Sequence, residues 1–177
     1  MQTAPRTLIL GVGNILLRDE GFGVHVIKAM EGSALPKGSD LLDGGTAALD
    51  ILNHITDYQR LIVIDAVKGG RPPGSIYRFT PDDLTPESKL LTSVHQIDLL
   101  DVLRMADALG CRPARVVIIG VEPKTIGVGL ELSPELQARV SQVAELALLE
   151  IEGKSITSNQ DHVRIYCERG SVVLRSK

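Results

Sequence analysis

Six consecutive residues, 61–66, constrain the fold of this chain more than any other segment. Their sequence, LIVIDA, is an almost continuous run of apolar side chains with an aspartate near its end. Such a run is typical of a strand that is covered on both faces of its sheet. Residues 7–11 and 116–121 have the same character, and segments with helical spacing lie between these runs. This alternation predicts a parallel sheet between two layers of helices.

Five strands and four helices are expected in the first 153 residues. The strands are expected at residues 7–11, 41–45, 61–66, 75–79 and 116–121, and the helices at 20–30, 47–55, 93–109 and 134–153. Ser93 and Gln96 have capping-box spacing at the start of the third helix. Ser133, which precedes a proline and a glutamate, is expected to cap the fourth. The predicted fold class is α/β, with a twisted, mostly parallel five-stranded sheet and helices on both faces.

The character of the sequence changes after Gly153. Residues 154–161 are polar, and residues 162–167 and 172–175 alternate on either side of a turn, as in a small β-hairpin. A hairpin alone is marginally stable, so this one should pack on the body of the protein or on a partner chain. We therefore expect an α/β domain over residues 1–153 and a C-terminal hairpin extension over residues 154–177.

The composition argues against several functional classes. With 177 residues, 44% hydrophobic and 23% charged, the chain is an ordinary globular domain. A net charge of −3 argues against nucleic-acid binding as the main function. No apolar run approaches the roughly 20 residues that span a bilayer, and the N-terminus has no signal-peptide layout. Two widely separated cysteines suit a reducing compartment. We expect a cytoplasmic protein that binds neither membrane nor nucleic acid.

The glycine-rich stretch at residues 11–24 begins like a nucleotide-binding loop and then departs from one. Leu16 stands where a dinucleotide-binding loop needs its third glycine, and no lysine follows as in a P-loop. Asp19 and Glu20 occupy the turn instead, where their charges would repel a phosphate. The turn is therefore better suited to a cation.

Three side chains that can bind metals are expected at one edge of the sheet. Glu20 follows the first strand, Asp65 ends the third, and His95 lies in the first turn of the third helix. In open parallel sheets, ligands bind beyond the carboxyl ends of the strands. Two carboxylates and an imidazole form a plausible site for nickel or zinc, with coordination positions left open. The fields at helix N-termini favour an ionised Glu20 and a neutral His95.

Each candidate also has a purely structural interpretation. Glu20 could be a dipole-matching acid, Asp65 a turn cap and His95 a solvated residue at a helix start. Asp43, in the segment DGGT at residues 43–46, could shape a glycine turn or serve as a base or substrate anchor beside the metal. Asp19 is the acid better suited to supporting the turn.

Taken together, these segments resemble the hydrogenase maturation endopeptidases. Those enzymes remove a C-terminal peptide from the large-subunit precursor of nickel-iron hydrogenases once nickel has been inserted. The shared segments are residues 11–24, DGGT at 43–46, the strand ending at 65–66, SVHQ at 93–96, IGVEP at 119–123 and LSP at 132–134. They follow the family's order and cover roughly residues 6–152.

The resemblance implies that Glu20, Asp65 and His95 are metal ligands and that Asp43 matters for activity. Val94 stands where relatives often carry a proline. The implied function is a hydrolase, a nickel-dependent endopeptidase whose partner is the hydrogenase large-subunit precursor. If the precursor supplies the nickel, the isolated enzyme need not contain a metal.

Two other functions remain open on the sequence. The chain could be a general metallopeptidase with a resident metal, or a non-enzymatic protein that docks nickel or the precursor. The sequence does not determine the oligomeric state.

Overall fold

The computed structural model describes residues 5–46, 48–84, 94–153, 165–167 and 170–172; for residues 48–49, 94–98 and the two last segments, it describes the backbone only. Its elements, in chain order, are β1 (Thr7–Val12), the 3-10 turn η1 (Asp19–Gly21), α1 (Phe22–Met30), β2 (Ser39–Gly45), α2 (Ala48–Ile55), β3 (Arg60–Ala66), β4 (Ile76–Phe79), the 3-10 turn η2 (Pro81–Asp83), α3 (Val94–Ala108), β5 (Arg115–Val121), α4 (Pro134–Gln137), α5 (Val140–Glu152), β6 (Ile165–Cys167) and β7 (Gly170–Val172).

A single sheet runs through the molecule in the order β2-β1-β3-β5-β4-β6-β7. β2, β1, β3 and β5 are parallel, and β4 is antiparallel to β5. The predicted mostly parallel, five-stranded body is therefore confirmed. β6 pairs in parallel with β4, and β7 pairs antiparallel with β6, so the predicted hairpin extends the same sheet. Gly153, with φ 66°, closes α5, and residues 154–164 lie outside the described residues.

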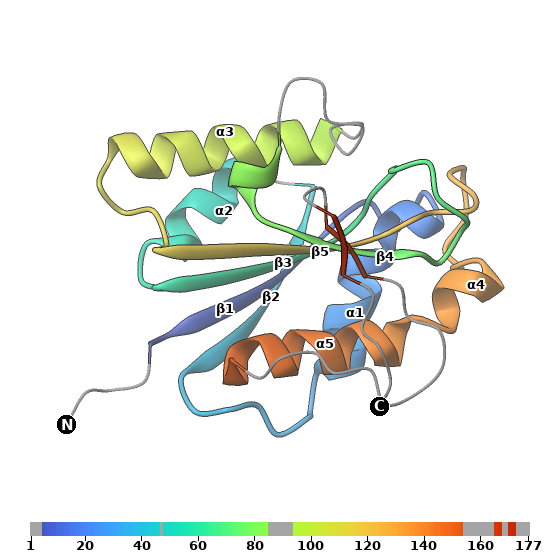
Figure 1. Ribbon diagram of the computed structural model, residues 1–177, viewed down its shortest axis with the longest axis horizontal. Coiled ribbons are helices and arrows are strands. Elements are labelled where there is room, and N and C mark those ends of the chain that lie inside the picture. The colour runs from blue at the N-terminus through green and yellow to red at the C-terminus, as the bar shows by residue number, and fades with distance from the viewer. Residues whose placement is uncertain (1–4, 47, 85–93, 154–164, 168–169, 173–177) are drawn as a thin grey trace.

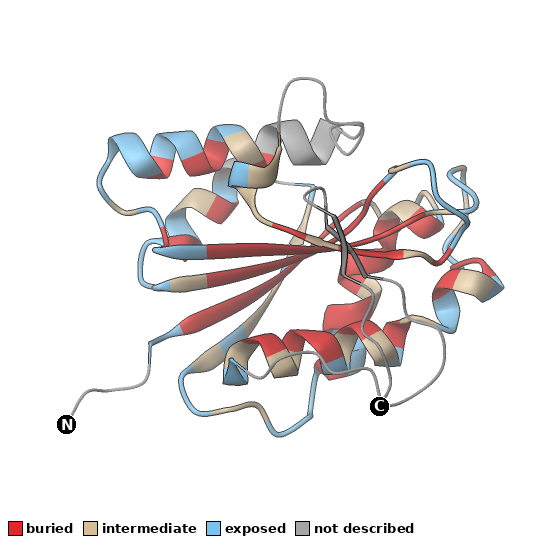
Figure 2. Cartoon of the chain, in the orientation of Figure 1, coloured by how far each residue is buried: buried red, intermediate tan, exposed pale blue. Residues whose placement is uncertain are grey.

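Helices cover both faces of the sheet, with α1 and α5 on one face and α2 and α3 on the other (Figure 1). The central strands β1, β3 and β5 are buried along nearly their whole length, whereas the edge strand β2 is half-buried or exposed (Figure 2). On β3, Ile62 and Ile64 pack into the core beneath α1 and α5, whereas Leu61 and Val63 pack into the core beneath α2 and α3. Because both faces are covered, both sets of side chains must be apolar. No helix in the described part of the chain is long and apolar enough to cross a membrane.

The predicted helix over residues 134–153 is two helices in the structure. α4 ends at Gln137 and α5 begins at Val140, although neither glycine nor proline marks the break. At this turn the Arg139 guanidinium donates to the Gly74 carbonyl oxygen at 3.1 Å and to Gln142 Oε1 at 2.9 Å. The contact with Gly74 joins the turn to a distant loop, which local helix signals cannot reveal.

Ser133 occupies the predicted N-cap position of α4, before Pro134 and Glu135, but its side chain does not bond to the helix. Its hydroxyl donates to the buried Asp19 carboxylate at 2.9 Å, and α4 has no side-chain cap. The free groups at a helix start are N–H donors, and the hydroxyl oxygen of Ser133, which is turned toward Asp19, accepts none of them. The other predicted cap, Ser93, lies outside the described residues.

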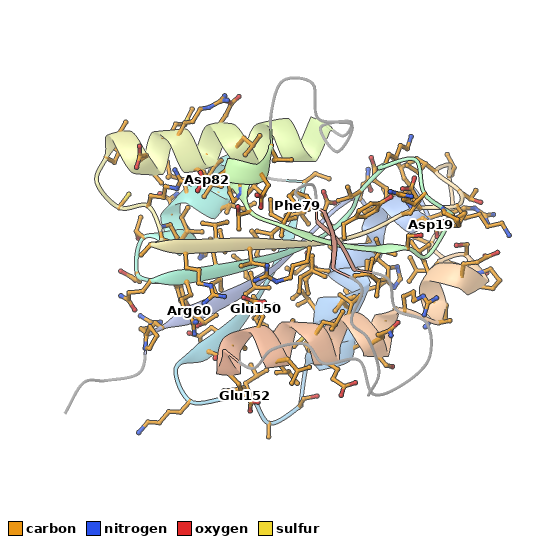
Figure 3. All side chains as sticks on the ribbon, in the orientation of Figure 1. Asp19, Arg60, Phe79, Asp82, Glu150 and Glu152 are labelled. Carbon is orange, nitrogen blue, oxygen red and sulfur yellow. The ribbon has the colours of Figure 1, made fainter. Side chains whose placement is uncertain are left out.

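A buried ion pair fastens α5 to the sheet. The Glu150 carboxylate on α5 is almost completely buried and accepts two hydrogen bonds from Arg78 on β4, both at 2.9 Å, and one from Arg115 on β5 at 2.6 Å (Figure 3). Burial raises the pKa of Glu150, but the hydrogen bonds and charges of the two arginines outweigh it and hold this pKa below the ordinary value of 4.5. The ionised form is therefore the one that stabilises the fold.

A Glu150→Gln variant should be less stable than the wild type at neutral pH by about 2 kcal/mol. The pKa of Glu150 is lower in the folded than in the unfolded protein. Its contribution is therefore fully present above pH 4.5 and is lost as the pH falls through the folded-state pKa. Urea denaturation at several pH values should show the two proteins converging in acid. The exposed Glu145 of the same helix provides the control, because Glu145→Gln should follow the wild type at every pH. A constant difference between Glu150→Gln and wild type down to strong acid would contradict the assignment.

Candidate functional site

The glycine-rich segment forms a tight crossing between β1 and α1. A Cβ on Gly23 would lie 2.1 Å from the Ile64 carbonyl oxygen, and one on Gly13 would lie 1.9 Å from that of Glu20. Only glycine permits these approaches, and Gly13 also has a φ of 130°. Asn14 Oδ1 accepts the Leu16 N–H at 2.9 Å and tightens the turn. The glycines serve close packing of the turn against the sheet.

Asp19 is completely buried and joins this turn to a distant loop (Figure 3). Its Oδ2 accepts the backbone N–H groups of Lys124 at 2.9 Å and Thr125 at 2.7 Å, and the Ser133 hydroxyl at 2.9 Å. Its Oδ1 accepts the Ser133 N–H at 2.7 Å. The expectation that Asp19 supports the turn is therefore confirmed. These bonds also fix both ends of the loop at residues 124–133.

Glu20 and Asp65, two of the three predicted ligands, lie close together. The η1 turn, which contains Glu20, contacts β3, which contains Asp65. Asp65 is only 2% exposed, and its Oδ1 accepts the Ala66 N–H at 2.8 Å. Burial raises the pKa of Asp65 to about 8; the negative charge of Glu20 adds to this, and the Ala66 N–H opposes it. Two neighbouring carboxylates, one of them buried, are an arrangement that a bound cation would stabilise.

The helix that carries His95 begins at the same edge of the sheet. α3 runs antiparallel to β5, so its first turn lies toward the carboxyl ends of the parallel strands (Figure 1). Side chains along β3 alternate between the two faces of the sheet. Asp65, two residues after Val63, therefore lies on the same face as Val63, which α2 and α3 cover. The structure does not describe the side chain of His95. Among the described residues, no group of three potential metal ligands is found. The three-residue ligand set thus stays a prediction.

Asp43 lies apart from this pair of carboxylates. It is exposed near the end of β2, and its Oδ1 accepts the Gly45 N–H at 3.0 Å, which shapes the glycine turn. Asp43 pairs in register with Gly11, whose Cβ would point into α1, 2.3 Å from the Gly23 carbonyl oxygen. Paired residues of a parallel sheet share a face, so Asp43 belongs to the α1 face and Asp65 to the opposite one. β1 also lies between their two strands.

Comparison with known proteins identifies the family. The family model described as hydrogenase maturation protease matches residues 24–150. The chain belongs to the hydrogenase maturation protease family. This chain is 31% identical over 153 residues to the hydrogenase 2 maturation protease of Escherichia coli, and the aligned part covers 85% of this chain and 93% of the relative. It is 36% identical over 152 residues to the hydrogenase expression/formation protein HupD of Thiocapsa roseopersicina, with 84% of this chain and 68% of the relative covered.

Solved structures agree with the sequence relatives. The hydrogenase maturating endopeptidase HybD from E. coli superposes with a TM-score of 0.75 at 31% identity, covering 84% of this chain and 93% of that one. The maturation protease HybD from Thermococcus kodakarensis gives 0.68 at 31% identity, covering 80% and 96%. The predicted family, fold and enzyme class are confirmed: this maturation protease is a hydrolase, an endopeptidase of hydrogenase maturation. Its family decides against the alternative of a non-enzymatic docking protein.

The structural role of Glu122 was not predicted from the sequence. This buried residue follows β5, and its Oε2 accepts the N–H groups of Gly69 at 2.8 Å and Arg71 at 3.1 Å, as well as the Tyr77 hydroxyl. It thereby holds the loop that follows Asp65 on β3. The only signal in the sequence was its place in the segment IGVEP at residues 119–123, which the family resemblance includes.

Proposed function

We propose that this maturation protease removes the C-terminal peptide of a nickel-loaded nickel-iron hydrogenase large-subunit precursor, and that Glu20, Asp65 and His95 bind the precursor's nickel. The observation that carries the proposal is the position of Glu20 beside the buried Asp65, at the edge where α3 begins. The nickel is part of the substrate, so the isolated protein needs no metal of its own. Without nickel the three side chains have nothing to bind, which makes cleavage depend on nickel loading.

The proposed ligands suit this metal. Carboxylate oxygens and an imidazole nitrogen are donors that a borderline ion such as nickel accepts. If the imidazole is neutral, the two carboxylates balance the charge of a divalent ion. This balance favours binding at a site where Asp65 is shielded from water, because no net charge is then buried. Three protein ligands also leave positions for groups that the precursor contributes.

Asp43 is proposed as the residue that activates the attacking water. Its carboxylate is exposed and can meet solvent. One intervening strand separates β2 from β3, so Asp43 stands roughly 10 Å across the sheet from Asp65, twice the strand spacing. The scissile peptide would therefore extend from the nickel across the end of β1 toward Asp43.

Cleavage of matched precursors tests the proposal. Purified protein is incubated with nickel-loaded and with nickel-free precursor, and the products are compared by mass. We expect loss of the C-terminal peptide from the nickel-loaded form alone; equal cleavage of both forms would overturn nickel recognition. Run in parallel, Asp43→Asn should process the loaded precursor at least about 100-fold more slowly if Asp43 activates the water.

Metal analysis separates this proposal from a metallopeptidase with a resident metal. That alternative requires stoichiometric metal in the purified protein and turnover of short peptides without a nickel centre. We further propose that the reaction takes place in the cytoplasm, in keeping with a chain that has only two cysteines.

A further inference from the structure

Two neighbouring loops expose a group of aliphatic side chains beside Glu20. Six large apolar residues are exposed in the described part of the chain, and four belong to these loops. We call them the aliphatic patch: Leu16 at 59% exposure, Ile126 at 41%, Val128 at 89% and Leu130 at 62%. Single exposed apolar residues are ordinary on protein surfaces, but several together mark an interaction site.

Backbone contacts join the two loops that carry the patch. The Arg18 N–H donates to the Gly129 carbonyl oxygen, and the Gly129 N–H donates to that of Leu16, both at 2.9 Å. Leu17 forms an isolated bridge with Gly129, and Arg18 forms one with Ile126. The patch therefore lies on two loops that pair through their backbones, although they are about 110 residues apart in the sequence.

Hydrogen bonds to the buried Asp19 also hold the second of these loops in place. Asp19 fastens the loop of residues 124–133 at both ends through Lys124, Thr125 and Ser133. Arg18, next to it, has φ 53° and ψ −117°, a conformation that non-glycine residues seldom adopt. Its backbone contacts with the second loop keep it there. A surface that is already ordered loses little conformational entropy when a partner covers it.

We infer that the aliphatic patch binds an apolar segment of the precursor polypeptide next to its nickel centre. This inference rests on the proposed function, because that function brings the precursor to Glu20. Glu20 lies four residues from Leu16 in the same turn, and its N–H donates to the Leu17 carbonyl oxygen at 3.3 Å. A polypeptide that binds at Glu20 would therefore lie close to the patch. Aliphatic side chains select an aliphatic partner and gain little from a charged one.

Binding measurements on both forms of the precursor test this inference separately from nickel recognition. Leu16→Ser and Val128→Ser should each weaken the affinity for nickel-loaded and for nickel-free precursor by the same factor, about 10-fold for the loss of one buried aliphatic side chain. Glu20→Gln should weaken the affinity for the nickel-loaded form alone. In cleavage assays the two patch variants should raise KM and leave kcat nearly unchanged.

Leu109→Ser is the matched control. Leu109 is 70% exposed, but it follows α3 at the opposite edge of the sheet, so its replacement should change neither affinity nor KM. Urea midpoints equal to that of the wild type would show that all three serine variants are folded. Leu16→Met should restore wild-type affinity, because it restores an apolar side chain of similar volume.

Unchanged affinities in both patch variants would overturn the inference. So would wild-type dimers that Leu16→Ser and Val128→Ser convert to monomers in sedimentation velocity, because a second copy of the chain would then be what covers the patch. If Glu20→Gln binds nickel-loaded precursor normally while the patch variants bind both forms weakly, the nickel ligands are wrong and the patch stands.

Discussion

Replacing Glu20 with glutamine should slow cleavage of nickel-loaded precursor by at least about 100-fold, more than the loss of a group that only orients a metal ligand. Glutamine keeps the shape of the side chain but removes the charge, and its amide oxygen is a weak donor to a divalent ion. Asp65, 2% exposed, would then face the nickel without the second carboxylate. Single-turnover cleavage, followed by the mass of the large subunit, measures the effect.

A glutamate at the far end of α1 supplies the control for this prediction. Glu31 is exposed directly after α1, and Glu31→Gln should cleave the precursor at the wild-type rate. His95→Gln extends the test to the ligand whose side chain the structure does not describe. If Glu20→Gln and His95→Gln both process the precursor normally, the ligand set is wrong even though the family is correct.

Replacing Asp19 with asparagine should lower the free energy of unfolding by about 3 kcal/mol. Oδ2 accepts three hydrogen bonds and Oδ1 accepts one, all in a completely buried site. Either orientation of the asparagine amide would turn its NH₂ group toward at least one backbone N–H. That donor would stay buried without an acceptor. Urea denaturation measures the loss.

An exposed aspartate provides the comparison for Asp19. Asp101 pairs with Arg104 on the surface of α3, and Asp101→Asn should cost less than roughly 0.5 kcal/mol. Because Asp19 also orders the loop that carries three residues of the aliphatic patch, Asp19→Asn should raise KM for the precursor as well. An Asp19→Asn protein as stable as the wild type would show that the network is not what fixes the two loops.

Much of the fold could be predicted because its signals are local. The buried run at residues 61–66 indicated a strand covered on both faces, and the glycines at 11–23 marked a tight crossing. The split between α4 and α5 could not be predicted, because neither glycine nor proline marks it and the Arg139 side chain at this turn bonds to Gly74, 65 residues away. The partner of the Ser133 hydroxyl could not be predicted either, because Asp19 is 114 residues away.

The candidate site was predictable only as a set of residues at one edge. Glu20 and Asp65 each follow or end a strand, and the carboxyl ends of parallel strands meet, so their proximity followed from topology. The position of Asp43 did not, because it depends on strand order and register, which place β1 between β2 and β3. The register with the neighbouring strand sets the face of the sheet on which an acid at a strand end lies. Sequence spacing alone does not reveal that register.

The sequence by itself determined the α/β class, the order of strands and helices, and which acidic residues would lie at the edge of the sheet. Hydrophobic periodicity and glycine placement act between residues close in the chain, so they can be read without coordinates. The tertiary structure alone decided that Asp19 ties the first turn to residues 124–133, that this contact builds an aliphatic surface beside Glu20, and that the C-terminal hairpin joins β4. Each of these depends on which distant segments pack together, and that is settled by the burial of the whole chain.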